Sequence, residues 1–235
     1  MNELKRQACE ANRELPRRGL VLYSWGNVSL VDRERNLVII KPAGLPYDEL
    51  TPEKMNTLTL DGEELEGPYR PSVDIPIHLE LYRAFPGVTS IVHTHSTYAT
   101  IWAQAGKPIP VFGTTHADYF NGPVPCAGIV PEEEVLSDYE AATGRGIISC
   151  FSSMNPLEIP GCLAKGHGVF TWGTDVWEAV HNAVVLEEIA RMALWTLQLN
   201  PQAGPLPDYL LKCHFQRKNG PDAYFQIDDK GARNV

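Results

Sequence analysis

The sequence predicts an α/β protein: one domain in which helices flank a largely antiparallel sheet. Two observations favour this class. Strand-like and helix-like segments are interspersed along all 235 residues, and no linker-like stretch divides them. Tight turns join neighbouring strands at residues 33–36 and at Asp61-Gly62, a dipeptide that suits a type I′ hairpin. Because such hairpins outnumber strand–helix–strand units, we expect most strand pairs to be antiparallel.

The first third of the chain supplies most of the predicted strands. An alternating segment begins at residues 25–29, and a second strand covers residues 37–40 after the turn. Proline and glycine predict a loop at residues 41–44. Residues 57–60 and 63–66 then form the two arms of the Asp-Gly hairpin.

Helical patterns fill much of the remaining chain. Their N-termini carry polar capping residues: Ser72 or Asp74 for the second predicted helix, Ser96 for the third, and Thr174 or Asp175 for the longest one. Pro16, Gly106 and Asn219-Gly220 are typical stop signals. The predicted helices span residues 4–15, 75–85, 96–106, 132–143, 175–199 and 207–218.

Two further strands and one long loop complete the prediction. Short apolar runs at residues 91–95 and 161–165 suit buried strands. Residues 108–128 contain several prolines and glycines, which predict a polar loop, and residues 147–151 are compatible with either helix or strand. The polar residues 226–235 predict a mobile tail.

Composition excludes several classes of function. The net charge of −9 gives no general attraction to nucleic acid or anionic membranes, so an anionic substrate needs a locally basic pocket. Five cysteines without a C-x-x-C pair favour neither a disulfide framework nor a thiolate zinc site, and a reducing compartment fits best. Residues 1–18 lack the apolar core of a signal peptide, and no apolar run suits a membrane span, so we expect a cytoplasmic protein.

Two histidines at the end of the 91–95 strand are the clearest chemical signal. In a strand, residues i and i+2 share a face, so His93 and His95 present two imidazoles side by side, and imidazole suits zinc and related metals. Equally, one ring can pack in the core while the other is solvated. His167, which lies between two glycines, is the best third ligand, and Asp74 is a candidate fourth ligand or base.

Other polar residues have simpler interpretations. His78 follows Asp74 by one helical turn and is expected to be buried and hydrogen-bonded. His181 lies among apolar residues of the longest helix, which favours a place in the core over metal binding. Asp118 lies in the polar loop, where a turn-forming role is the simplest explanation for an isolated Asp.

Eight sequence blocks, in order along nearly the whole chain, resemble the L-ribulose-5-phosphate 4-epimerases of the class II aldolase/epimerase family. Together they are far more specific than the His-x-His pair alone. The blocks are WGNVS (25–29), KPAG (41–44), PSVDIPIH (71–78), IVHTHS (91–96), ATIWAQAG (99–106), GTTHADYF (113–120), HGVFTWG (167–173) and HNAVVLEE (181–188).

The resemblance implies the architecture and the metal. Residues 1–225 would form one class II aldolase domain, a three-layer sandwich, followed by the tail at 226–235. One zinc ion, or another divalent metal, would be held in each subunit by His93, His95 and His167, with Asp74 beside or on it. The resemblance also implies a homotetramer with each active site between subunits, acting on a sugar phosphate in cytoplasmic pentose metabolism such as L-arabinose catabolism.

The implied reaction is a retro-aldol cleavage of C3–C4, which leaves an enediolate at the metal, followed by re-addition to the other face of the aldehyde. Asp118 would exchange a proton on one face, and a tail tyrosine of the neighbouring subunit on the other. Here that tyrosine position holds Phe225, which has no transferable proton. Three alternatives stay open: Tyr224 replaces it, water replaces it, or epimerisation is impaired.

The implied substrate pocket also departs from the family pattern. Ala43 and Val73 stand where the family has serines, and each lost hydrogen bond to phosphate removes roughly 1.5–3 kcal/mol of binding. A lyase, either an aldolase or a decarboxylase acting on a related hydroxy-carbonyl compound with or without phosphate, is therefore the alternative function; a zinc-binding homologue with impaired catalysis is the second alternative. The implied substrate-binding residues are Gly26, Asn27, Lys41, Ala43, Gly44, Ser72, Val73, His116, His214, Arg217 and Phe225.

Overall fold

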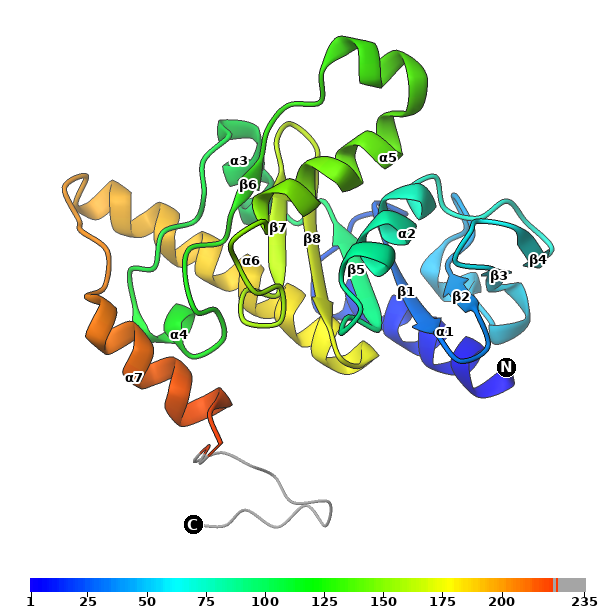
Figure 1. Cartoon of the computed structure of the whole chain (residues 1–235), viewed down its shortest axis with the longest axis horizontal. Helices are drawn as coiled ribbons and strands as arrows, with labels where there is room; N and C mark the ends of the chain where they lie inside the picture. Colours follow the sequence, from blue (N-terminus) through cyan, green and yellow to red (C-terminus); the bar gives the residue numbers. More distant parts are fainter. Residues whose placement is uncertain (222, 224–235) are drawn as a thin grey trace.

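A single mixed sheet organises the protein (Figure 1). The structure is a computed structural model that describes residues 1–221 and 223. Within that part of the chain, eight strands pair in the order β4-β3-β2-β1-β5-β8-β7-β6, and every neighbouring pair is antiparallel except β6 and β7. The strands are β1 Gly26–Asp32, β2 Leu37–Ile40, β3 Asn56–Leu58, β4 Glu64–Glu66, β5 Ser90–Thr94, β6 Cys126–Ala127, β7 Gly161–Ala164 and β8 Gly168–Gly173.

Helices cover both faces of the sheet, which confirms the predicted three-layer sandwich. On one face, Val28 and Leu30 of β1 share a buried cluster with α1 and the first half of α6. On the other face, Ile40 and Ile91 share a cluster with α2 and α5. The helices are α1 Asn2–Arg17, α2 Ile75–Ala84, α3 Thr97–Ala105, α4 Thr114–Ala117, α5 Glu132–Cys150, α6 Val176–Leu199 and α7 Asp208–Asn219, with 3-10 turns at Tyr47–Glu49 and Pro52–Lys54.

The predicted cap of α3 is wrong in its details, because Ser96 occupies the N-cap position without making a capping hydrogen bond. Glu187, which comes from α6, accepts from the backbone N–H groups of Tyr98 at 2.8 Å and Ala99 at 2.9 Å instead. A carboxylate stabilises a helix N-terminus by charge as well as by hydrogen bonding. A residue far along the chain thus fixes the helix that follows directly after the His93/His95 strand.

Helix α5 extends beyond the predicted stop at Gly144 and continues to Cys150. Gly144 is needed inside the helix because a Cβ there would come within 2.8 Å of the Glu80 side chain on α2. The helix bends at Asp138, where φ −162° and ψ 81° are not helical. Asp138 Oδ1 accepts from the Ala141 N–H at 3.1 Å, so this residue caps a second helical segment.

Three smaller predictions also need correction. The loop predicted at residues 108–128 contains α4 and β6, and β8 was not predicted as a strand. His181 is exposed on α6 beside the Tyr119 ring and is not a core residue. The predicted tail at residues 226–235 lies outside the described residues. Within residues 1–221, no helix is long and apolar enough to cross a membrane.

Candidate active site

Three histidines converge where β5 ends and β8 begins. His93 lies in β5, His95 lies one residue beyond its end, and His167 lies in the turn that precedes β8. The antiparallel pairing of β5 with β8 brings the turn back to His95. The Nε2 atom of His93 lies 3.1 Å from that of His95 and 3.2 Å from that of His167. The structure thus brings together the three predicted metal ligands.

The hydrogen bonds of these rings prepare them to bind a cation. His93 Nδ1 donates to the Val169 carbonyl at 3.0 Å, which leaves a lone pair on Nε2. The pKa of His93 is lowered to about 3, chiefly by burial and with help from His167 and His95, although Asp74 acts to raise it, so this ring is neutral at physiological pH. Neutral imidazoles whose Nε2 lone pairs face one another are poorly satisfied alone and well satisfied by a divalent cation. The residues present therefore fit a metal.

Asp74 lies beside the histidines at the N-cap position of α2. Its Oδ2 is 4.0 Å from His93 Nε2, and it accepts hydrogen bonds from Asn27 at 2.7 Å and Ser72 at 3.2 Å. Burial acts to raise the pKa of Asp74, but the nearby histidines and the bond from Asn27 lower it overall. The carboxylate makes no capping bond to α2 and is instead directed toward the histidines.

Two loops predicted to bind substrate run side by side next to Asp74. The Ser72 N–H donates to the Lys41 carbonyl at 3.0 Å, and the Ala43 N–H donates to the Arg70 carbonyl at 2.9 Å. Gly44 lies in the same pair of loops with a left-handed φ of +67°. Val73 is 67 % exposed and offers no hydroxyl group.

Lys41 is the buried cation of this region. It is 2 % exposed, its Nζ donates to the Pro42 carbonyl at 3.2 Å, and its ammonium lies 5.0 Å from the centre of the Tyr47 ring. No carboxylate pairs with it among residues 1–221, and burial lowers its pKa to about 8. Tyr47 also donates to the Gly26 carbonyl at 2.7 Å. Gly26 packs closely against β5, because a Cβ at this position would come within 2.7 Å of the His93 carbonyl.

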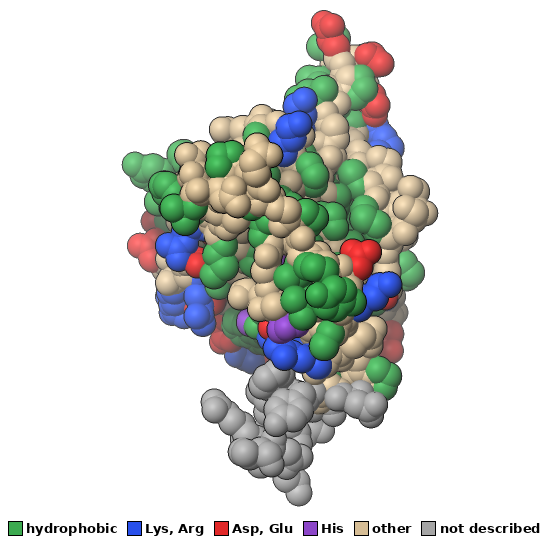
Figure 2. Space-filling model, turned by 90° about the vertical axis from the view of Figure 1, so that its left-hand side faces the viewer, with side chains coloured by type: hydrophobic (Ala, Val, Ile, Leu, Met, Phe, Trp, Pro, Cys, Tyr) green, Lys and Arg blue, Asp and Glu red, His purple; other side chains and the backbone are tan. Residues whose placement is uncertain are grey.

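A second polar cluster joins α4 to α7. His214 Nδ1 donates to Asp118 Oδ1 at 2.9 Å, and Arg217 lies 3.8 Å from the same oxygen. His116 is buried, and its Nε2 donates to the Gly122 carbonyl at 2.9 Å, which braces the α4 loop. Figure 2 faces this end of the molecule, where histidine and basic side chains reach the surface. Tyr224 and Phe225 lie outside the described residues.

The two clusters lie apart within one chain. In Figure 1, α4 and α7 lie at the lower left, whereas the β7–β8 turn that carries His167 lies at the upper middle of the molecule, next to α5. Among the described residues, no hydrogen bond or ion pair joins Asp118 or His214 to the three clustered histidines. His78 is not a ligand either: as predicted, it is fully buried, with Nδ1 2.7 Å from Ser29 Oγ.

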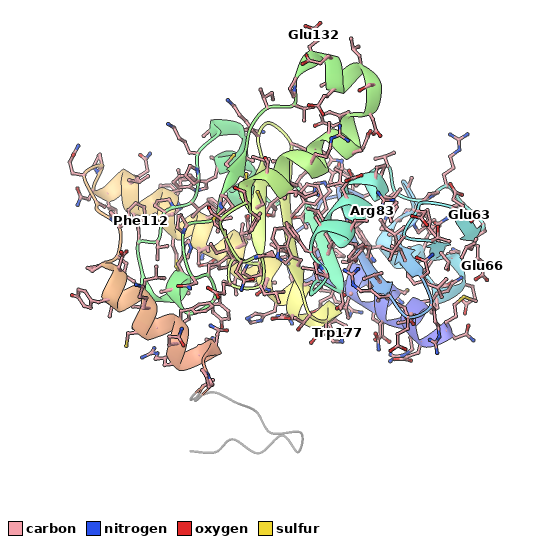
Figure 3. All side chains as sticks on the ribbon, viewed as in Figure 1. Glu63, Glu66, Arg83, Phe112, Glu132 and Trp177 are labelled. Atoms are coloured by element: carbon pink, nitrogen blue, oxygen red, sulfur yellow. The ribbon has the colours of Figure 1, made fainter. Side chains whose placement is uncertain are left out.

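Sequence reasoning missed Tyr139, whose hydroxyl lies 2.9 Å from His167 Nδ1. Tyr139 follows the bend in α5, where the helix turns back toward the sheet from the protruding segment that begins at Glu132 (Figure 3). No local signal could have found this contact, because 28 residues separate the two partners.

Comparisons with known proteins agree with this geometry. The family model described as Class II Aldolase and Adducin N-terminal domain matches residues 6–194. The L-ribulose-5-phosphate 4-epimerases UlaF of Salmonella paratyphi B and Salmonella typhi are each 52% identical over 225 residues, which cover 96% of this chain and 99% of the relative.

Solved structures share the fold. An L-fuculose 1-phosphate aldolase superposes with a TM-score of 0.80 at 21% identity, over 92% of this chain and 95% of its own. The L-fuculose-1-phosphate aldolase of Thermus thermophilus superposes with a TM-score of 0.65 at 25% identity, over 88% of this chain and 100% of its own. These matches confirm the class II aldolase fold predicted from the sequence. The chain belongs to the class II aldolase and adducin N-terminal domain family.

Proposed function

We propose that this protein is a divalent-metal-dependent L-ribulose-5-phosphate 4-epimerase that interconverts L-ribulose 5-phosphate and D-xylulose 5-phosphate. The observation that carries the proposal is the set of three histidines whose ligand nitrogens lie within 4.8 Å of one another, with Asp74 beside them, in a chain 52% identical to proteins of that name. Epimerisation at C4 proceeds by cleavage and re-formation of the C3–C4 bond, so the total of atoms and electrons is unchanged.

His93, His95 and His167 would hold the cation, which we take to be zinc, and Asp74 would complete or border its ligand set. When bound, the cation supplies a Lewis acid for the negative charge that develops on the ketone half of the substrate. Asn27 keeps the Asp74 carboxylate oriented through its 2.7 Å bond, and its own Oδ1 is a buried acceptor with no partner in the described structure.

Lys41, Gly44 and Ser72 would hold the phosphate end of the substrate. The adjacent loops offer one buried ammonium beside the left-handed turn at Gly44, which together suit a phosphate. The pocket has fewer hydroxyl donors than the family pattern because Ala43 and Val73 carry none. We therefore expect weaker phosphate binding than the family norm, with a raised KM as the result.

Proton transfer would come from the second cluster. Asp118 is suited to exchange a proton with the C4 oxygen, and the bond from His214 holds its carboxylate in place. The separation of this cluster from the histidines within one chain supports active sites shared between neighbouring subunits of a tetramer. A cytoplasmic location and a role in pentose catabolism complete the proposal.

A lyase reaction is the second candidate, and one observation favours it. Phe225 stands at the position of the second proton-transfer group and cannot donate or accept a proton. Cleavage in one direction needs proton transfer on one face of the aldehyde, whereas epimerisation needs it on two. Loss of the second group therefore harms an epimerase more than an aldolase or a decarboxylase.

One experiment separates these functions. The metal-loaded protein is incubated with L-ribulose 5-phosphate, and the products are followed by NMR. Appearance of D-xylulose 5-phosphate supports the epimerase. Release of a two- or three-carbon aldehyde without epimerisation, trapped as its hydrazone, supports the lyase. If neither product forms at high enzyme concentration, the proposed reaction is ruled out.

A further inference from the structure

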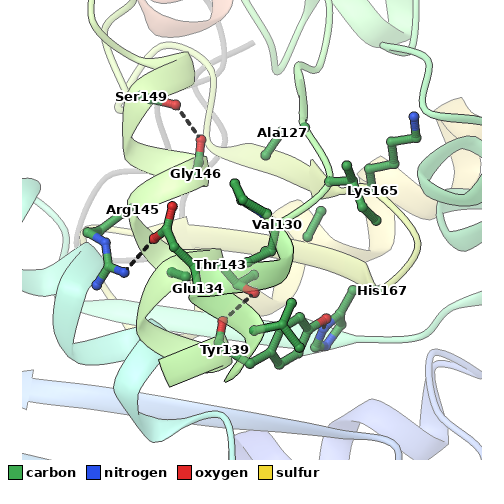
Figure 4. A pocket seen from close by; sticks show the side chains of 16 residues that line it. Ala127, Val130, Glu134, Tyr139, Thr143, Arg145, Gly146, Ser149, Lys165 and His167 are labelled. Atoms are coloured by element: carbon green, nitrogen blue, oxygen red, sulfur yellow. Dashed lines mark hydrogen bonds and ion pairs between the residues drawn. The ribbon is translucent and has the colours of Figure 1, made fainter. Parts of the chain in front are cut away.

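We propose that Tyr139 is a positioning residue that holds the ring of His167 in the orientation needed for metal binding. The inference rests on the proposed metal site and adds a residue that the predicted ligand set does not contain. The Tyr139 hydroxyl lies 2.9 Å from His167 Nδ1, and the two rings are nearly parallel, with an angle of 15° and a centroid distance of 6.0 Å. Figure 4 shows the rings side by side at one end of a pocket.

His167 needs such support more than His93 does. His93 is fixed by the strand pairing of β5, by its bond to the Val169 carbonyl and by stacking on Phe170 at 4.3 Å. His167 lies in a turn between two glycines, Gly166 with φ +75° and Gly168, so the local backbone restrains it less. The hydroxyl of Tyr139 is the hydrogen-bond partner of its Nδ1.

The bond also selects the tautomer. A His167 ring that binds a cation through Nε2 must carry its proton on Nδ1. In that state Nδ1 donates and the Tyr139 oxygen accepts. Residues that accept from a metal-bound histidine orient its ring and raise its basicity, and their loss typically weakens metal binding by about 10–100-fold.

Tyr139 is itself held firmly. It begins the second segment of α5, directly after the bend at Asp138 that turns the helix toward the sheet. The Asp138 carboxylate caps this segment, and Thr143 Oγ1 donates to the Tyr139 carbonyl at 2.9 Å. A side chain at the start of a capped helical segment has a defined direction, so its hydroxyl is a fixed point against which the His167 ring can be set.

The ring and the hydroxyl of Tyr139 have separable roles. The ring forms part of the wall of a pocket of about 450 Å³ that is also lined by Val130, Ala142 and Lys165. The hydroxyl makes the hydrogen bond to His167. Tyr139→Phe therefore removes the bond and keeps the packing. Ser149→Ala is a matched control because Ser149 lines the same pocket from the same helix and its hydroxyl donates to the Gly146 carbonyl at 2.8 Å.

The test measures metal binding and does not depend on catalysis. Zn²⁺ and Co²⁺ dissociation constants are determined by competition with a chelator for the wild type, Tyr139→Phe and Ser149→Ala. The visible spectrum of the Co²⁺ forms reports ligand geometry. We expect Tyr139→Phe to bind both ions about 10–100-fold more weakly, with an altered Co²⁺ spectrum and an unchanged melting temperature of the metal-free protein. Ser149→Ala should match the wild type.

The outcomes are distinguishable. A wild-type constant and spectrum for Tyr139→Phe would overturn the role of Tyr139 and leave the metal site intact. Equal weakening in Tyr139→Phe and Ser149→Ala would show a general effect of the pocket and would also overturn it. A wild-type protein that binds neither ion would overturn the metal site itself, and this inference with it.

Discussion

The histidine cluster and the Asp118 cluster are built in different ways. Strand register fixes His93 and, through the β5–β8 pairing, brings His167 to it, with all three histidines held near one point. Asp118 instead depends on the contact between α4, a single turn of helix, and α7, in which Phe215 is the one buried residue. The first cluster is complete in one chain, and the second presents its groups at the surface.

This difference fits the proposed division of the active site between neighbouring copies. The metal end needs positions that are accurate to tenths of an ångström, and a sheet provides them. The Asp118 cluster lies apart from the histidines within the same chain, so under the proposed function it is suited to complete the site of a neighbouring copy. Each subunit would then contribute the metal end of one active site and the acid–base end of another.

The largest predicted effects test this division. His93→Asn should weaken metal binding by more than about 100-fold and abolish activity, because it removes a ligand and not merely a supporting residue. Asp118→Asn should lower kcat by about 10²–10⁴ and leave metal affinity unchanged. Metal titration of each purified variant, together with steady-state rates, provides both measurements.

Mixing the two inactive variants makes the comparison sharper. If neighbouring copies share each site, co-expressed His93→Asn and Asp118→Asn subunits will assemble with about one quarter of sites intact, and activity will return to that extent. Each variant expressed alone is the control. If the mixed assemblies form and stay inactive, both clusters serve the same chain, and the proposed division is wrong.

The second prediction concerns Phe225, the position where the family pattern has a tyrosine. Phe225→Tyr is expected to raise epimerisation by roughly tenfold or more, since it restores the second proton-transfer group. NMR measurement of both directions of epimerisation gives the gain. Tyr224→Phe is the matched control: if it removes the basal activity and Phe225→Tyr adds nothing, Tyr224 already serves as the acid.

The metal end was predictable from sequence because its determinants are local. The i, i+2 spacing of His93 and His95 follows from strand geometry, and glycines beside His167 indicate space for a close approach. The helix starts at Asp74 and Asp175 follow from capping preferences, although only Asp175 makes capping bonds with its side chain. At Asp74 the carboxylate is directed toward the histidines instead.

Contacts between distant segments could not be predicted in the same way. Tyr139 and Glu187 support the histidine cluster from α5 and α6, and neither has a spacing that points to its partner. Gly144 looked like a helix stop, but packing against Glu80 of α2 requires a glycine within the helix. Tertiary packing, and not local helix propensity, determines the contacts and the helical conformation at these positions.

The third prediction uses a buried histidine at the Asp118 end. Burial lowers the pKa of His116 to about 4, although its bond to the Gly122 carbonyl acts in the opposite direction. The unfolded chain, with a pKa near 6.5, binds more protons than the folded one between these values. The contribution of His116 to the free energy of unfolding is therefore fully present above about pH 6.5 and is lost as the pH drops toward 4. At pH 5 the loss from this residue is about 2 kcal/mol.

Urea unfolding of the metal-free protein near pH 7 and pH 5 measures this loss, and His116→Gln isolates it. The variant is expected to lose about 2 kcal/mol less than the wild type over the same interval. Equal pH dependence in the two proteins would mean that His116 is accessible to protons in the folded state. The Asp118 loop would then be looser than its hydrogen bonds indicate.

The smallest predicted effect concerns how the histidine end is anchored. Glu187 caps α3 through the N–H groups of Tyr98 and Ala99, so Glu187→Ala should cost about 1–2 kcal/mol of unfolding free energy. Its neighbour Glu188 forms a surface ion pair with Arg191 at 2.6 Å, so Glu188→Ala should cost less than about 0.5 kcal/mol. Urea unfolding of the two variants compares them directly. A similar small cost for both would mean that the sheet alone, and not the cap on α3, holds the chain that follows His95 in place.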